Sequence, residues 1–145
     1  MLPERLPTAV HARITVLCER GNELLRRGDQ RAAYESFAQA WEVIPEPKID
    51  WEASTWVLSA LGDIMFCCCR YEEAKNLFLR AVQGPGGLGN PFIHLRIGQC
   101  QYESGNLEGA RENLTRAYMG GGLELFAKED PKYVDYLREF LDAVS

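Results

Sequence analysis

The sequence predicts an all-α protein built from three helical hairpins, and three observations lead to this prediction. A fixed spacing of one glycine and several apolar residues occurs three times along the chain. Within each copy, the apolar residues after the glycine are spaced three and four apart, as they are on one face of a helix. Residues typical of helix ends stand between these stretches. A chain of 145 residues is about one domain long, so residues 1–145 are expected to form a single domain.

Each copy of the pattern begins at a glycine and continues with residues twelve, sixteen and nineteen positions later. The three sets are Gly21, Ala33, Phe37 and Ala40; Gly62, Ala74, Phe78 and Ala81; and Gly98, Ala110, Leu114 and Ala117. Helix axes approach to about 8 Å only where small residues lie at the crossing. We therefore expect two helices to pack closely in each copy, with Gly62 facing Ala74.

This pattern resembles the tetratricopeptide repeat family, whose unit reads W-x2-L-G-x2-Y, then A-x3-F, then A and P. Aligned on the glycines, the repeats cover residues 14–47, 55–88 and 91–124. The resemblance implies helix-turn-helix units stacked into a right-handed superhelical solenoid. The third repeat departs most from the family, because His94 and Gln101 stand where large apolar residues are preferred.

Turn and capping residues mark the ends of the expected helices. Gly28-Asp29 and Gly105-Asn106 each combine a residue suited to the left-handed end of one helix with a side chain that caps the next. Asn90-Pro91 places a capping residue before a proline at the first helical position. Extra residues in IPEPKID and GPGGLGN lengthen the loops between the repeats.

A further amphipathic segment follows the third repeat. It starts at Asp130-Pro131, and its apolar residues recur on one helical face: Val134, Leu137, Leu141 and Val144. A solenoid needs a terminal unit with a polar outer face to cover its open end. Residues 130–144 are therefore expected to form a capping helix.

Three consecutive cysteines, Cys67, Cys68 and Cys69, end the first helix of the second repeat. Cys69 takes the position that Gly28 and Gly105 hold in the other repeats, so the cysteines replace a turn. Zinc ligands usually come as separated pairs, whereas adjacent residues point in different directions around a helix. No metal or other cofactor is expected, and the three cysteines are interpreted as small packing residues.

Composition excludes several classes of partner. The net charge is −5, whereas nucleic-acid binders usually show a basic footprint, so no nucleic acid is expected. No apolar stretch approaches the ~20 residues that span a bilayer, and the first residues lack the apolar run of a signal peptide. Five cysteines without paired spacing favour free thiols in a reducing compartment. A cytoplasmic location without membrane contact is therefore expected.

Catalytic motifs are not evident in the sequence. It contains no nucleophile elbow, phosphate-binding loop, dinucleotide fingerprint or HExxH motif. The two histidines, His11 and His94, lie far apart in the repeat frame. The apolar setting of His94 is typical of a hydrogen-bonded core histidine. We therefore expect a protein that is not an enzyme.

The family resemblance also implies a binding surface, the concave wall formed by the first helix of each repeat. The partner-binding residues that it implies are Asn22, Arg26, Trp56, Ser59, Asp63, Phe66, Phe92, Leu95, Gln99 and Tyr102. Thr15 and Cys18 belong to the same wall. Exposed aromatic residues often dominate protein interfaces. The alternative is that the capping helix, the N-terminal segment or a second copy of the chain covers this wall, which leaves a homodimer open.

These expectations lead to a non-catalytic protein-interaction module. The second half of the chain, from NPFIHLRIGQCQYESGN to EDPKYVDYL, resembles small bacterial tetratricopeptide proteins associated with toxins. That resemblance implies an immunity protein that neutralises a basic toxin domain, since complementary charge speeds capture. The alternatives are a cytosolic chaperone for a secreted substrate, as in type III secretion, and a structural scaffold.

Overall fold

The computed structural model describes residues 5–144, and all regular secondary structure in them is helical. This confirms the predicted all-α class. None of the helices in this part of the chain combines the length and the hydropathy needed to cross a membrane. The helices are α1 (Thr8–Arg26), α2 (Gln30–Val43), η1 (Lys48–Asp50), α3 (Glu52–Cys67), α4 (Tyr71–Val82), α5 (Pro91–Glu103), α6 (Leu107–Gly121), η2 (Leu123–Phe126) and α7 (Pro131–Val144), where η marks a short 3-10 helix.

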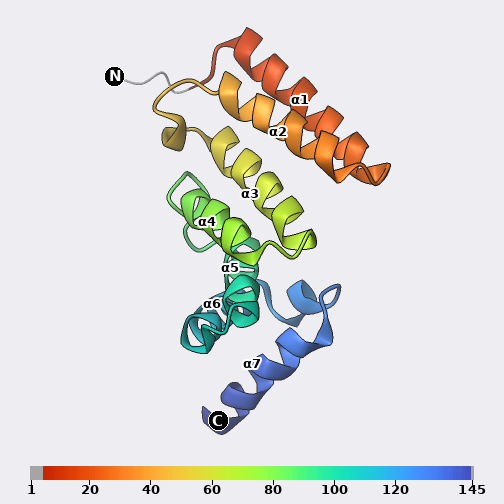
Figure 1. Cartoon of the computed structure of the whole chain (residues 1–145). Helices are drawn as coiled ribbons and strands as arrows, with labels where there is room; N and C mark the ends of the chain where they lie inside the picture. Colours follow the sequence, from red (N-terminus) through yellow and green to blue (C-terminus); the bar gives the residue numbers. More distant parts are fainter. Residues whose placement is uncertain (1–4, 145) are drawn as a thin grey trace.

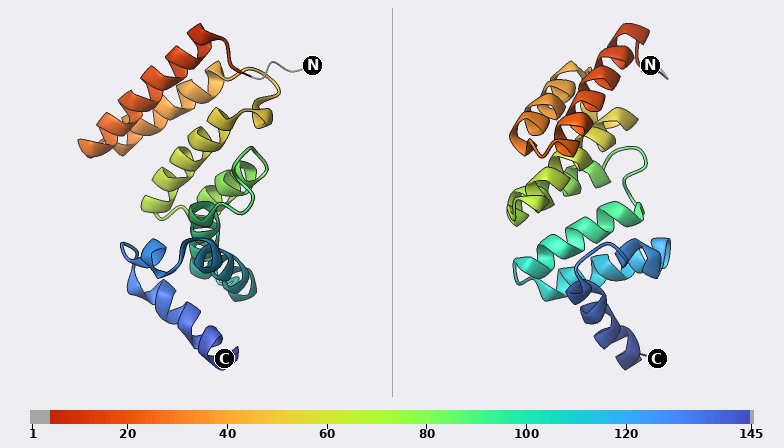
Figure 2. Two further views of the ribbon diagram at one scale, coloured as in Figure 1. Left: turned by 180° about the vertical axis from the view of Figure 1, so that it is seen from behind. Right: turned by 90° about the vertical axis from the view of Figure 1, so that its right-hand side faces the viewer.

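The helices pack in sequence order as three antiparallel hairpins (Figure 1). α1 packs against α2, α3 against α4, and α5 against α6, while α2 contacts α3 and α4 contacts α5. Figure 2 shows the hairpins following one another along the molecule, with the two ends of the chain at opposite ends. Each hairpin therefore buries apolar residues against the next, and the core consists of three clusters that share partly buried neighbours such as Trp41 and Phe66.

Close contact within each hairpin depends on its glycine. A Cβ atom added to Gly21 would lie 2.6 Å from the Phe37 ring, and one added to Gly62 would lie 2.8 Å from the Phe78 ring. The Phe78 ring is therefore the nearest neighbour of a Cβ at Gly62, while the expected contact between Gly62 and Ala74 stays a prediction. In the first hairpin, α1 begins at Thr8, before the expected start of the repeat at residue 14, because Val10 also packs on the core.

The tight turns share one hydrogen-bond pattern, in which the residue with positive φ donates to a carbonyl of the preceding turn. Gly28, Cys69 and Gly105 have φ angles of 82°, 61° and 85°. The Cys69 N–H donates to the Phe66 carbonyl over 3.0 Å, as the Gly28 N–H does to Leu25. Cys69 thus adopts the left-handed conformation that the sequence pattern predicts for this position.

The loop from Gly84 to Asn90 contacts α3, the end of α4 and α5. Thr55 of α3 donates its hydroxyl hydrogen bond to the Pro85 carbonyl over 2.8 Å. Gly87 is buried, and a Cβ there would lie 2.1 Å from the Ala81 carbonyl oxygen. The Gly89 N–H donates to Nε2 of His94 over 3.1 Å, so Nδ1 carries the proton and bonds to Asn113 over 3.0 Å. His94 is thus the hydrogen-bonded core histidine that its apolar setting predicts.

The C-terminal segment folds back on the third hairpin. Phe126 of η2 and Tyr133 and Leu137 of α7 are buried against Leu95 of α5 and Leu114 of α6. Asn106 and Asn90 cap α6 and α5 through hydrogen bonds to backbone N–H groups, as the sequence predicts. α7 lies where the capping helix is expected, although the side chain of Val144 lies outside the described residues.

Candidate functional site

The ten predicted wall residues all lie on α1, α3 and α5, the first helix of each hairpin. Asn22, Arg26 and Trp56 are exposed, and the Trp56 side chain reaches an exposed fraction of 53%. Five others are partly exposed: Ser59, Asp63, Phe66, Phe92 and Tyr102. Leu95 and Gln99 are buried, with exposed fractions of 1% and 0%. These two residues are unavailable to a partner, which corrects their assignment to a binding surface.

The C-terminal segment is the reason why the wall of α5 is closed. Leu95 packs against Phe126, Tyr133 and Leu137, while the Gln99 amide donates to the Glu129 carboxylate over 2.8 Å. The family frame places α5 residues on a wall without showing how the following segment folds. The wall is therefore open along α1 and the beginning of α3, and closed at Leu95 and Gln99 of α5.

Most predicted aromatic anchors are engaged within the protein. Phe66 stacks edge-on against Tyr71 at 5.6 Å between ring centroids, and Phe92 against Phe78 at 6.2 Å. Tyr102 contacts both Tyr133 and Tyr136 of α7. Trp56 is therefore the most exposed aromatic residue of the predicted wall.

A half-buried arginine, Arg96, fills the space between α3 and α5. Its guanidinium donates to Asp63 over 2.7 Å and to Gln99 over 2.8 Å, and it also bonds to Glu129. The guanidinium carbon lies 4.7 Å from the Phe66 ring centroid and 4.9 Å from that of Phe92. Burial alone lowers the pKa of Arg96, but the two carboxylates outweigh it and raise the pKa above its usual value.

The Arg96 cluster joins the second hairpin, the third hairpin and the segment before α7. Sequence reasoning missed this residue. The available signal was a single charged side chain, Arg96, within the otherwise uncharged helix PFIHLRIGQC. A charge in such a position is normally paired when the helix is buried on most sides.

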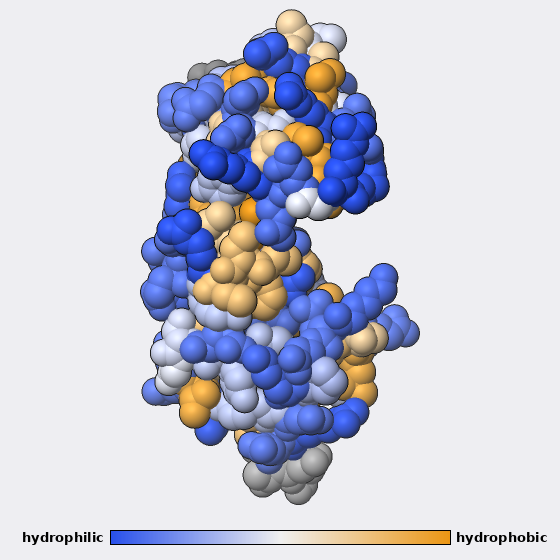
Figure 3. Space-filling model, turned by 45° about the vertical axis from the view of Figure 1, so that its right-hand side comes forward, coloured by the Kyte–Doolittle hydropathy of each residue, from blue (hydrophilic) through white to orange (hydrophobic). Residues whose placement is uncertain are grey.

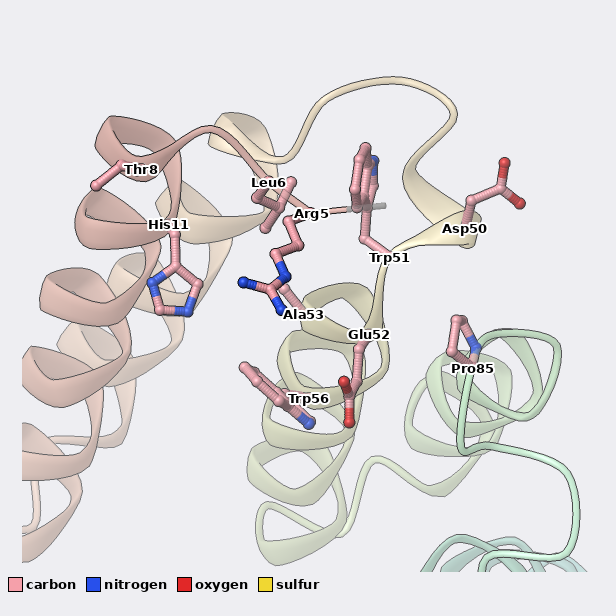
Figure 4. Close-up of a pocket in the computed structure, with 10 residues that line it drawn as sticks. All are labelled: Arg5, Leu6, Thr8, His11, Asp50, Trp51, Glu52, Ala53, Trp56 and Pro85. Carbon is pink, nitrogen blue, oxygen red and sulfur yellow. The ribbon is translucent and has the colours of Figure 1, made fainter. Parts of the chain in front are cut away.

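Two adjoining pockets lie between α1 and α3, and we call them together the α1–α3 groove. The outer pocket has a volume of about 720 Å³ and lies between the start of α1, η1 and the start of α3 (Figure 4). The inner pocket, of about 150 Å³, is lined by residues of α1 and α3. His11, Ala53 and Trp56 line both pockets. On the face drawn in Figure 3, the surface of the molecule is hollowed at mid-height on one side.

The inner pocket brings together several residues of the predicted wall. Thr15, Cys18 and Asn22 follow one face of α1 and meet Trp56 of α3 across the pocket. The predicted residues Arg26, Ser59 and Asp63 do not line either pocket. Arg26 instead pairs with Glu23 over 2.6 Å at the exposed end of α1.

The outer pocket adds residues that the family frame did not indicate. Trp51 forms part of its wall and is fixed by a hydrogen bond of 2.9 Å from Nε1 to the Pro45 carbonyl. Glu52 and Trp56 stand one helical turn apart on α3 and lie side by side, His11 projects from α1, and Arg5 reaches in from the segment before α1 (Figure 4). The sequence signal for Glu52 was its spacing of four residues from Trp56, which places both on one helix face.

Charges in the α1–α3 groove are mostly negative. Glu19 lines the inner pocket, and Asp50 and Glu52 line the outer one, against a single arginine, Arg5. No ion pair within the described part of the chain involves these four residues. The carboxylates are therefore available to charged groups of a partner.

The cysteines do not form a site with the side chains around them. Cys67, Cys68 and Cys69 are exposed, which corrects their interpretation as packing residues, and they form the end of α3 and its turn. Burial and the Asp63 charge raise the pKa of Cys67, and burial raises the pKa of Cys100 to about 12. Within residues 5–141, no group of three or more His, Cys, Asp or Glu side chains is placed to hold a metal ion.

No protein-family model matches the chain, and no curated protein is significantly similar to it. The fold and the groove define an all-helical protein of stacked hairpins with an exposed tryptophan between α1 and α3.

Proposed function

We propose that this chain is a protein-binding module of the tetratricopeptide type, in which three hairpins form a right-handed solenoid and α7 closes its end. In this proposal, the α1–α3 groove binds a segment of a partner protein. The observation that carries the proposal is the exposure of Trp56, 53%, at the junction of two adjoining pockets. A tryptophan beside a pocket is the side chain most enriched among residues that dominate binding energy.

The dimensions of the groove suit an extended segment. His11 and Asn22, the first and last residues of α1 that line the inner pocket, are eleven positions apart. At about 1.5 Å per residue this part of the helix is roughly 16 Å long, which matches about five residues of extended chain at ~3.3 Å each. The exposed amide of Asn22 can both donate to and accept from a peptide backbone.

Two kinds of partner fit this proposal. An immunity protein would bind a folded, basic toxin domain, whereas a chaperone for a secreted substrate would bind an extended segment before export. The net charge of −5 supports a basic partner in either case, and the stretch of α1 that lines the inner pocket, from His11 to Asn22, supports an extended one. Both roles are non-catalytic, require no cofactor and place the protein in the cytoplasm. A scaffold role or a homodimer joined through Trp56 are the other outcomes of the test.

A native pull-down with mass spectrometry tests the proposal by comparing wild type, Trp56→Ala and Met119→Ala. Met119 lies on α6 and is 78% exposed, so its substitution controls for loss of an exposed apolar side chain elsewhere. We expect wild type and Met119→Ala to capture one stoichiometric partner, and Trp56→Ala to lose it while keeping the same helical circular dichroism. Equal capture by all three proteins would contradict the proposal. The partner's identity separates a toxin, a secreted substrate and a second copy of the chain.

A further inference from the structure

Trp41 lies on α2 and is partly exposed. It shows how cationic side chains of this protein pack over the face of an exposed indole ring. The ammonium of Lys48 lies 5.4 Å from the Trp41 ring centroid, and the guanidinium carbon of Arg80 lies 5.1 Å from it. Cations within about 6 Å of an indole face are attracted to its negative electrostatic potential. Both cations come from the chain itself, so this site is already filled.

Trp56 is more exposed than Trp41 and has no such cation among the described residues. Its neighbour on the same face of α3 is the Glu52 carboxylate, as Figure 4 shows. An indole beside a carboxylate is complementary to a cationic side chain in two ways. The ring face attracts the charge and the aliphatic stem, and the carboxylate accepts hydrogen bonds from the ammonium or guanidinium.

The charge of the groove favours the same ligand. Asp50 and Glu52 border the outer pocket and Glu19 borders the inner one. The three arginines of α1, Arg13, Arg20 and Arg26, are exposed, but none of them lines either pocket of the groove. At physiological salt, charges separated by more than about 8 Å are largely screened, so the lining carboxylates dominate the interaction with a bound side chain.

We infer that the α1–α3 groove recognises a lysine or arginine side chain of an extended partner segment, held over the Trp56 indole with its charge beside Glu52. This inference rests on the proposed function. Arg5, from the segment before α1, also enters the outer pocket (Figure 4). Its guanidinium is not paired with Glu52 or Asp50 within the described residues, and it opposes a second cation by repulsion. Removing the charge of Arg5 therefore strengthens binding of the cationic segment.

The probes for this inference are arrays of eight-residue peptides with one fixed central residue, Lys, Arg, Gln or Glu, and mixed uncharged flanks. The tightest peptide with a fixed Lys or Arg is then compared with its Gln counterpart by fluorescence polarisation. The proteins are wild type, Glu52→Gln, Arg5→Gln and Glu42→Gln. Glu42 is exposed on α2 and lines neither pocket, so Glu42→Gln makes the same change of net charge away from the groove.

In wild type, replacing the cationic residue by Gln is expected to weaken binding about five- to tenfold. Glu52→Gln removes most of this difference, Arg5→Gln enlarges it, and Glu42→Gln leaves it unchanged. Circular dichroism of each variant shows that its fold is retained. Peptides that bind equally well with Lys, Gln or Glu overturn the inference, as does a preference that survives Glu52→Gln.

The two failures are distinguishable. Binding that depends on Trp56 but not on the charge of the peptide refutes the cation site and leaves the proposed function in place. If no peptide pool binds wild type at submillimolar concentration, the segment-binding function is refuted, and the inference with it.

Discussion

Gly62 of α3 and Phe78 of α4 lie in direct contact, so that a Cβ atom on the glycine would stand 2.8 Å from the aromatic ring. The same relationship, sixteen residues apart, joins Gly21 to Phe37 and Gly98 to Leu114. Each hairpin thus closes by placing one large side chain on a glycine of its partner helix. This contact explains why the spacing of sixteen residues between the glycine and the large apolar residue recurs in the sequence.

The first prediction is that Gly62→Ala destabilises the protein. The added methyl group must displace a fully buried phenylalanine ring, and such overpacking costs about 1–3 kcal/mol, which exceeds the gain of up to ~1 kcal/mol in helix propensity. We expect urea denaturation to show a net loss of about 1–2 kcal/mol. Gly109→Ala is the comparison, because its Cβ would meet the side chains of Gln101 and of the capping residue Asn106, which can shift, instead of a buried ring, so a smaller loss is expected.

A double variant identifies the cause of that loss. In the double variant Gly62→Ala/Phe78→Leu, the smaller leucine gives the new methyl group more room. The double variant should therefore lose less free energy of unfolding than the sum of the losses in the two single variants. Strict additivity of the two single losses would show that the contact between these two residues is not the source.

The second prediction concerns the strained turn at Cys69. A side chain in the left-handed conformation costs about 1–2 kcal/mol relative to glycine, and Cys69 has a φ angle of 61°. Cys69→Gly should therefore raise the melting temperature, even though it removes an exposed side chain. Gly28→Ala tests the reverse change in the equivalent turn, where space is open and only backbone strain is added. A lower melting temperature for Cys69→Gly contradicts this account.

The third prediction is that Arg96→Met destabilises the protein more than the same substitution at any exposed arginine. It leaves the carboxylates of Asp63 and Glu129 without their shared cation, and breaking a buried pair on one side typically costs about 3–5 kcal/mol. Asp63 is partly exposed, so the lower end of this range is expected. Adding Glu129→Gln to Arg96→Met should recover part of the loss, because it removes one of the stranded charges. If neither Glu129→Gln nor Asp63→Asn restores any of the stability lost in Arg96→Met, the unpaired charges are not the cause of the loss.

The fourth prediction is a loss of stability at alkaline pH. Burial raises the pKa of the Cys100 thiol to about 12, and burial together with a hydrogen bond to Glu103 raises the pKa of Tyr133 above its usual value. The folded state therefore holds both protons at a pH where the unfolded chain loses them. The free energy of unfolding should fall as the pH rises beyond about 9 for the thiol and about 10 for the phenol.

Chemical denaturation between pH 7 and pH 11 measures this dependence. Tyr133→Phe should be less stable at neutral pH, because it loses the hydrogen bond of 2.8 Å to Glu103, and should lose less further stability above pH 10 than wild type does. Tyr118→Phe, on α6, is the control and should retain the slope of wild type. An unchanged slope in Tyr133→Phe would falsify the assignment of the alkaline transition to this residue.

Sequence reasoning located the helices more successfully than the site. Periodicity and capping residues such as Asn90 and Asn106 depend on neighbours three or four residues away, so they can be seen in one dimension. The wall residues were assigned from their positions in the tetratricopeptide pattern, and position in that pattern does not show which residues are buried. The assignment included Leu95 and Gln99, which the C-terminal segment covers, and it omitted Glu52, which lies beside Trp56 in the outer pocket.

By itself, the sequence determined the helical class, the glycine of each hairpin at which two helices pack closely and the left-handed turn at Cys69, because each follows from local sterics and helix geometry. Only the tertiary structure decided which part of the wall stays open. The fold-back of η2 and α7 buries Leu95, and Arg96 fills the space between Phe66 and Phe92. These contacts join residues about thirty positions apart, and their energy depends on burial and charge pairing that exist only once the hairpins are packed.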